Sequence, residues 1–292
     1  MGEKLTPEQQ VTDYFNTWES RWGYRLLLKG TKHFGYYPQG HKQLSMSEAL
    51  RLMEDELAQR LALDRGALVL DAGCGEGGTA LHLAGNYGLR IQGVDLMDSS
   101  VEIARKKAKD LGLAERVTFH TGDYTELTYA KGTFDGVYAM ETLVHVADFG
   151  KALQGFRRVL KAGSRLVLFE YSLLPREKMT SRQRAIVDLV VEESAMHSLP
   201  AFSHGQFPNL LSQAGFGDIA VENITPRVMP MLTKFYRFAY FPYQLIKFFG
   251  LQRQFVNATC AVEWYRDIVK NDLWRYNIIS ASKPAEHFIR EQ

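Results

Sequence analysis

The chain has 292 residues, of which 46% are hydrophobic and 23% are charged, and its formal net charge is +2. These values are typical of a globular protein with a large core and give no reason to expect a nucleic-acid partner. No apolar run reaches the roughly 18 residues of a membrane span, and the N-terminus lacks a signal-peptide core. Only Cys74 and Cys260 are present, so no disulfide framework is expected. We therefore expect a cytoplasmic protein, without a bound metal.

Residues 1–44 are predicted to form a helical N-terminal arm. Thr6, Pro7 and Gln9 give three agreeing signals for a helix start, and the helix is expected to continue to Gly23 or Gly30. The next segment, 33–38, is aromatic and is broken by glycine and proline. Two interpretations stay open: a packed surface arm, or a cover for a cofactor and one wall of an apolar pocket. In the second, Tyr37 is a candidate substrate-binding residue.

From residue 45 the pattern changes to regular strand–helix alternation. Ser45 with Glu48 forms a capping box, and Ser99 with Glu102 is a second candidate box. The expected strands are 68–71, 90–94, 116–121, 134–139 and 165–170, and the expected helices are 78–86, 99–110 and 148–160. Such alternation predicts an α/β fold, a parallel sheet with helices on both faces.

The first strand runs into a glycine-rich turn. Gly73, Gly75 and Gly78 satisfy the dinucleotide pattern G-x-G-x-x-G. Asp71, Gly73, Gly75 and Gly77 satisfy D-x-G-x-G-x-G instead. Glycine count alone does not separate these two patterns, so the acidic residues around the turn decide between them.

Three acids follow three successive strands: Asp71, Asp95 and Asp123. At a strand tip Asp71 can face a ligand's ammonium group, and Asp95 can bind both ribose hydroxyls. This arrangement resembles the class I methyltransferases that use S-adenosylmethionine (SAM). The resemblance implies a Rossmann-like, seven-stranded, mostly parallel sheet and SAM as the cofactor. It also implies a set of cofactor-binding residues: Asp71, Gly73, Gly75, Gly77, Asp95, Leu96, Gly122, Asp123 and Tyr124.

The end of the fourth strand carries Tyr138, Ala139, Glu141, His145 and Asp148 in the pattern Y-A-x-E-x-x-x-H-x-x-D. It resembles the sterol C-methyltransferases, which group with the tocopherol methyltransferases and the cyclopropane fatty-acid synthases. That resemblance implies a preference for lipophilic acceptors.

Ligands of open α/β sheets bind beyond the carboxyl ends of the strands, so four residues are expected near the acceptor: Glu141, His145, Glu170 and Tyr171. Glu141 and His145 are the candidate catalytic residues, because either could accept one proton. The alternatives are structural: a hydrogen bond from Glu141 to a loop, and a capping or core role for His145.

After Pro175 the chain is expected to add a helical, aromatic cap through insertions at about 176–202 and 226–262 of the 45–292 domain. A helix at 181–194, a core helix at 206–214 and strands at 218–224 and 274–281 are predicted there. Phe235, Tyr236 and Tyr240 join Tyr37 and Tyr171 as candidate substrate residues. The aromatic stretch 233–249 fits a cap over the substrate, a membrane-surface anchor or a homo-oligomer interface.

These resemblances imply a SAM-dependent methyltransferase of secondary metabolism, acting on a small lipophilic acceptor such as a specialised metabolite, a sterol or a terpenoid-like molecule. An alternative is a SAM-binding enzyme that cyclises or rearranges such a molecule. An NAD-dependent oxidoreductase is less favoured, because of Asp71.

Overall fold

A computed structural model describes residues 5–28 and 30–285, and it contains one seven-stranded sheet in the order β3-β2-β1-β4-β5-β7-β6. Strands β1 to β5 are parallel, and β7 is antiparallel to both of its neighbours. The strand bounds are β1 Leu68–Ala72, β2 Arg90–Asp95, β3 Val117–Thr121, β4 Phe134–Met140, β5 Leu160–Leu173, β6 Gly217–Asn223 and β7 Trp274–Ser282. The predicted α/β fold is confirmed.

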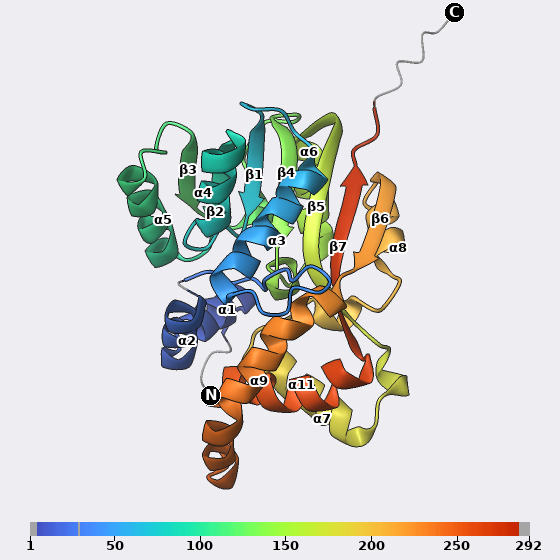
Figure 1. The fold of residues 1–292 in the computed structure, drawn as a ribbon. Helices are drawn as coiled ribbons and strands as arrows, with labels where there is room; N and C mark the ends of the chain where they lie inside the picture. Colours follow the sequence, from blue (N-terminus) through green and yellow to red (C-terminus); the bar gives the residue numbers. More distant parts are fainter. Residues whose placement is uncertain (1–4, 29, 286–292) are drawn as a thin grey trace, which may run out of the picture.

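Helices lie on both faces of the sheet (Figure 1). Helix α3 crosses one face, and α6 lies behind the other. The α-helices are α1 Pro7–Asn16, α2 Trp18–Leu28, α3 Met46–Leu61, α4 Gly78–His82, α5 Asp98–Asp110, α6 Phe149–Val159, α7 Ser181–Glu193, α8 Phe207–Gln213, α9 Thr225–Phe248, α10 Val256–Thr259 and α11 Tyr265–Asp267. Short π-helices, Leu83–Tyr87 and Cys260–Trp264, continue α4 and α10.

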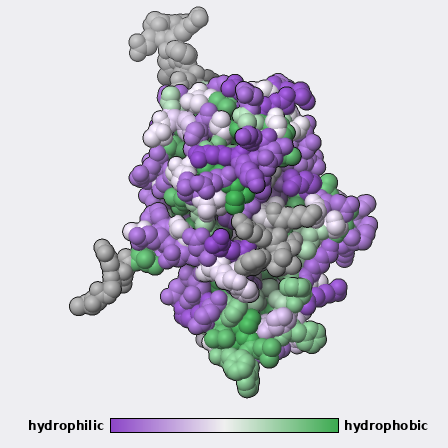
Figure 2. All heavy atoms as spheres, turned by 90° about the vertical axis from the view of Figure 1, so that its left-hand side faces the viewer, coloured by the Kyte–Doolittle hydropathy of each residue, from purple (hydrophilic) through white to green (hydrophobic). Residues whose placement is uncertain are grey.

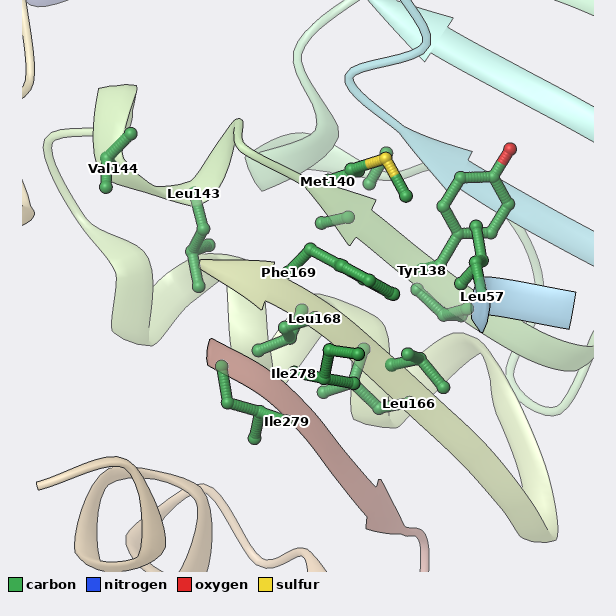
Figure 3. Packing of buried hydrophobic residues seen from close by; sticks show 14 of the residues in the cluster. Leu57, Tyr138, Met140, Leu143, Val144, Leu166, Leu168, Phe169, Ile278 and Ile279 are labelled. Atoms are coloured by element: carbon green, nitrogen blue, oxygen red, sulfur yellow. The ribbon is translucent and has the colours of Figure 1, made fainter. Parts of the chain in front are cut away.

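The main core lies between the sheet and these helices, and its centre is the set of strands β4, β5 and β7 (Figure 3). Tyr138, Phe169 and Ile278 are each at most 1% exposed there. Burial of such side chains stabilises the fold by about 1.5–3 kcal/mol each. The strand ends that carry the polar side chains are therefore fixed to a rigid platform.

One helix break and one helix start differ from the sequence prediction. The N-terminal helix breaks at Thr17, whose extended backbone (ψ 146°) ends α1 and whose hydroxyl accepts a hydrogen bond from Ser20 N. Helix α5 begins at Asp98 rather than at a Ser99–Glu102 capping box. The reason is that Asp95 Oδ1 accepts a hydrogen bond from Met97 N at 2.9 Å and turns the chain into the helix early.

Helices α7, α9 and α11 gather beyond the carboxyl ends of the parallel strands, next to α1 and α2 (Figure 1). The N-terminal helices are hydrogen-bonded to this cap. Glu19 accepts from the backbone N–H groups of Asn257 and Ala258 at 2.9 and 2.8 Å, and the Tyr14 hydroxyl donates to Asn257. Among the described residues, no helix is long and apolar enough to cross a membrane.

Candidate cofactor and acceptor site

A cavity of about 280 Å³ opens at the carboxyl ends of β1, β2 and β4. The three strand-end acids, Asp71, Asp95 and Asp123, all line it, together with Leu96 and Tyr124. The structure therefore brings together most of the residues that the sequence assigned to a cofactor. The two exceptions are Gly77 and Gly122, which do not line the cavity.

Asp71 is the buried acid of the set, with 3% of its surface exposed. No hydrogen bond of ordinary distance and angle reaches its Oδ2 atom within the described part of the chain. Burial raises the pKa of this carboxyl to about 7, and the neighbouring Tyr138 hydroxyl opposes that rise. A buried carboxylate oxygen without a well-placed donor is costly, so this position suits a ligand's ammonium group.

The other two acids hold their own loops in place. Asp95 accepts hydrogen bonds from Gly75 N (2.8 Å) and from Met97 N (2.9 Å). Asp123 accepts from the backbone N–H and the hydroxyl of Thr125 at 2.7 and 2.8 Å. Each carboxylate oxygen has a second lone pair, so both side chains can still accept a hydrogen bond from a ligand in the cavity.

The glycines of the turn are present for different physical reasons. A Cβ on Gly73 would come within 2.5 Å of the Thr142 side chain, and one on Gly77 within 2.6 Å of Phe119. These two positions are required by packing and by a positive φ. Gly75 and Gly78 have no close neighbour, since the nearest atoms to an added Cβ would be in Lys32 at 3.9 Å and Thr31 at 3.7 Å. The bare backbone that the sequence suggested for ligand approach is thus found at these two glycines.

Residues 30–34 pass over this turn before the chain reaches α3. Lys32 and His33 line the cavity, and Phe34 N donates to Glu141 Oε1 at 2.6 Å. His33 Nε2 lies 3.5 Å from the fully buried carboxylate of Glu54 on α3. The segment thus lies over the strand-end cavity, and its role as a cover for a cofactor stays a prediction. Sequence analysis singled out neither Lys32 nor His33 as a site residue.

Glu141 directly follows β4, and its backbone lies in the left-handed region with φ 57°. Its Oε1 accepts from Phe34 N and from the Tyr276 hydroxyl (2.7 Å), and its Oε2 accepts from the Tyr171 hydroxyl. Burial raises the pKa of the Glu141 carboxyl, and the bonds from the two tyrosines oppose that rise. With three donors satisfied, this carboxylate joins the arm to the sheet.

His145 ends a 3₁₀-helix, Leu143–His145, and lines the same cavity. Its Nδ1 lies 3.1 Å from the carbonyl oxygen of Ala195. A carbonyl only accepts, so Nδ1 carries the proton. Burial lowers the pKa of His145 to about 4, so the ring is neutral near neutral pH and its lone pair is on Nε2.

A second, mainly apolar cavity of about 330 Å³ lies under the cap. The two cavities have six lining residues in common, which are Tyr14, Lys32, His33, Glu141, Tyr171 and Met196.

Of the predicted substrate residues, Tyr171 and Phe235 line the apolar cavity. Tyr37 packs instead in a small core with Leu50 and Met231, and Tyr236 stacks on Tyr265 with ring centroids 4.9 Å apart. Tyr240 contacts Tyr236 and Phe241. None of these three lines either cavity. Trp264, Trp274 and Asn257, which the sequence did not single out, line the apolar one.

Comparison with known proteins identifies one family model and two sequence relatives. A family model for a methyltransferase domain matches residues 69–163. The chain is 33% identical to an S-adenosyl-L-methionine-dependent Diels–Alderase of Talaromyces variabilis, over 95% of this chain and 96% of that protein. It is 31% identical to the norajmaline N-methyltransferase of Rauvolfia serpentina, over 79% of this chain and 81% of that protein.

The fold is also similar to a solved structure. The crystal structure of the (4+2) cyclase SpnF superposes with a TM-score of 0.74 at 24% identity, covering 96% of this chain and 98% of that chain. The two sequence relatives are named for different reactions, one a Diels–Alder cyclisation and the other an N-methylation.

Proposed function

Because the chain belongs to the class I SAM-dependent methyltransferases, we propose that it transfers a methyl group from SAM to a small lipophilic acceptor, a specialised metabolite, bound in the apolar cavity. The observation that supports this most directly is that the apolar cavity shares six lining residues with the strand-end cavity. An acceptor in the one would lie next to a cofactor in the other. An NAD-dependent oxidoreductase gains no support from these relatives.

SAM fits the residues present. We assign the ammonium group of its methionine part to Asp71, whose Oδ2 lacks a well-placed donor within the described residues. The turn at Gly73 and Gly75 would take the methionine end, and Asp95 with Leu96 would take the ribose. Asp123 and Tyr124 would bind the adenine.

SAM supplies a methyl group on a positively charged sulfur, which a nucleophile attacks directly. The protein must therefore align the acceptor and accept one proton, and alignment alone can favour such a reaction by about 7–11 kcal/mol. We assign the proton to His145 Nε2, the lone-pair atom of a neutral ring that is fixed through its Nδ1–H. Glu141 would act by position, because its hydrogen bond to Phe34 N holds the arm over the cavities.

The second candidate is a cyclisation or rearrangement of the same kind of molecule with SAM bound. The Diels–Alderase relative at 33% identity, over almost the whole chain, specifically favours it. In that case SAM would contribute charge and shape, and its methyl group would stay in place.

Product mass separates the two reactions. The full chain is incubated with methyl-labelled SAM and with extracts of lipophilic metabolites, and new products are identified by mass spectrometry. Methyl transfer adds one labelled methyl group, and cyclisation gives a product of unchanged mass. New products that form equally well without SAM, or no SAM binding by calorimetry, would contradict both candidates.

The exposed end of α9 adds a proposal about where the acceptor comes from. Phe238, Phe241 and Phe248 are 68%, 78% and 80% exposed, and Leu245 and Phe249 continue the same surface. Figure 2 shows hydrophobic atoms gathered at the lower end of the molecule, where this part of α9 lies in Figure 1. Phe238, Ala239 and Pro242 also line the apolar cavity.

The surface is thus continuous with the mouth of the cavity, and we propose that it contacts a lipid surface from which apolar acceptors enter. A homo-oligomer interface is the competing explanation, and a cytoplasmic location stays a prediction.

A further inference from the structure

Lys32 is a charged side chain in an unexpected place, because it lines both cavities. Its Nζ lies 4.3 Å from the centroid of the Phe15 ring. Within the described chain no carboxylate lies at ion-pair distance from it. Burial lowers the pKa of Lys32, and the negative charges of Asp95 and Glu76 oppose that shift. An ammonium in such surroundings needs an acceptor to offset its desolvation.

The acids around Lys32 are engaged elsewhere. Both oxygens of Asp95 accept backbone hydrogen bonds, from Gly75 and Met97. Glu76 Oε2 forms an ion pair with Lys107 Nζ at 2.8 Å. Neutralisation of these acids therefore does not account for the position of Lys32.

His145 contacts the same Phe15 ring as Lys32. Its ring meets the Phe15 ring edge-on with centroids 5.2 Å apart, so Phe15 contacts both the ammonium and the imidazole. The charge of Lys32 is also one of the causes that lower the pKa of His145. A proton acceptor and a cation thus lie on the same ring, where the two cavities meet.

We propose that Lys32 binds an oxygen atom of the acceptor that is anionic or becomes anionic, so that the acceptor is an acidic hydroxyl compound, a phenol or an enol. This inference rests on the proposed function and names its substrate class. The acceptor O–H bond breaks, its proton forms a new bond to His145 Nε2, and the electron pair stays on the oxygen beside the Lys32 ammonium. For a cyclisation substrate the same ammonium would donate to a conjugated carbonyl oxygen.

The test uses para-nitrophenol as the probe, because its phenol and phenolate forms absorb at different wavelengths. The probe is titrated into the full chain saturated with S-adenosylhomocysteine, and the bound phenolate fraction is measured. Charge-assisted hydrogen bonds are the stronger class, so we expect Lys32→Met to weaken phenolate binding at least about tenfold. Lys32→Arg keeps the cation and should retain most of the binding. The affinity of para-nitroanisole, which has no acidic proton, should be equal in wild type and Lys32→Met.

Lys270→Met is the matched control, because Lys270 Nζ also lies over an aromatic ring, that of Tyr265 at 5.6 Å, but lines neither cavity. It should behave as wild type. Equal phenolate binding by wild type and Lys32→Met, or no preference of wild type for para-nitrophenol over para-nitroanisole, would overturn the proposal.

The methionine carboxylate of the cofactor is the other oxyanion that Lys32 could bind. Calorimetry with S-adenosylhomocysteine and with methylthioadenosine, which lacks that carboxylate, separates the two sources. We expect Lys32→Met to change neither affinity. A loss for S-adenosylhomocysteine alone would assign Lys32 to the cofactor and reject the acceptor role. Failure of the proposed function itself would be visible separately, as a wild-type chain that binds no SAM.

Discussion

At the scale of single residues, the buried carboxyl of Asp71 makes cofactor binding depend on pH. Burial raises the pKa of Asp71 to about 7, so near that pH the carboxyl is partly protonated before a ligand binds. A ligand ammonium favours the ionised form and lowers this pKa, so binding releases a proton. We expect SAM affinity to rise as pH rises through about 7, and then to level off.

Calorimetry in buffers of different ionisation enthalpy measures this proton release directly. Asp71→Asn keeps the shape and removes the titration, so its SAM affinity should be lower and independent of the buffer. An Asp71→Asn protein that releases as many protons as wild type would show that another group titrates.

His145 gives a second prediction at this scale. Asn at position 145 can place an amide N–H near the Nδ1 position and keep the bond to the Ala195 carbonyl, but it has no basic atom. We expect His145→Asn to lower kcat by about 10²- to 10⁴-fold while the melting temperature changes little.

The pH profile gives an independent measure of the same group. A base with a pKa of about 4 stays neutral at higher pH. Protonation of His145 should therefore lower kcat only as pH decreases through about 4. A limb near the ordinary histidine value of 6.5 would contradict this environment for His145.

At the scale of elements, Glu141 connects the arm to the end of β4, and we propose that this, and not proton transfer, is its role. In Glu141→Gln the amide oxygen can still accept from Phe34 N, and the Tyr171 hydroxyl can turn to accept from the amide N–H₂. We therefore expect Glu141→Gln to keep most of its kcat, and Glu141→Ala to lose at least about tenfold by freeing the arm. Steady-state kinetics on both variants separate the two roles. If Glu141 were the general base, Glu141→Gln and Glu141→Ala would lose the same share of kcat.

Helix α9 gives a prediction about the exposed aromatic surface. Lys247 and Arg253 near this surface are ion-paired with Glu263 and Glu192, so apolar insertion rather than basic charge must supply the affinity for lipid. We expect wild type to co-sediment with neutral phosphatidylcholine vesicles and Phe241→Glu/Phe248→Glu to stay in the supernatant. If wild type ignores vesicles and the double variant converts a dimer to a monomer, the surface is an oligomer interface.

Features set by local sequence patterns were predicted well from the sequence, and contacts between distant residues were not. Strand ends and their acids, such as Asp71 and Asp95, are set by local patterns of apolar residues and glycine, and these were predicted correctly. The bond between Phe34 and Glu141 joins residues 107 positions apart, and no local pattern encodes it. Tyr37 looked like a pocket residue because it is aromatic, but its 2% exposure comes from packing on α3 and α9.

At the scale of the whole molecule, buried acids under the site influence the stability of the fold. Glu170, which the sequence placed near the acceptor, lines neither cavity. It is 1% exposed on β5, and its carboxylate oxygens accept from the backbone N–H groups of Val144 and Tyr171. Burial raises the pKa of Glu170 from 4.5 to about 8, despite these donors. Between these two values the folded state holds a proton that the unfolded state has lost, so stability must fall as pH rises.

Other buried groups limit the pH range in which the effect of Glu170 on stability can be measured. Asp71 acts in the same direction as pH rises through its pKa of about 7. The pKa of His145 falls from 6.5 to about 4, which makes the unfolded state the stronger proton binder in that interval, so its contribution rises with pH and opposes the acids. Asp71 is only half ionised at its pKa of about 7, and the pKa values of the buried His33 and Glu141 are also raised, so the contribution of Glu170 between about pH 7 and pH 8 is measured as the difference between wild type and Glu170→Gln.

We therefore expect Glu170 to lower the free energy of unfolding of the ligand-free protein by up to about 1.4 kcal/mol as pH rises by one unit through this interval. Urea denaturation at both ends of the interval measures it. Glu170→Gln has no carboxyl at this position, so whatever its absolute stability, its free energy of unfolding should fall less steeply than that of wild type. The exposed Glu115→Gln is the control and should follow wild type. Equal slopes for wild type and Glu170→Gln would mean that Glu170 is ionised throughout, with its two backbone donors outweighing its burial.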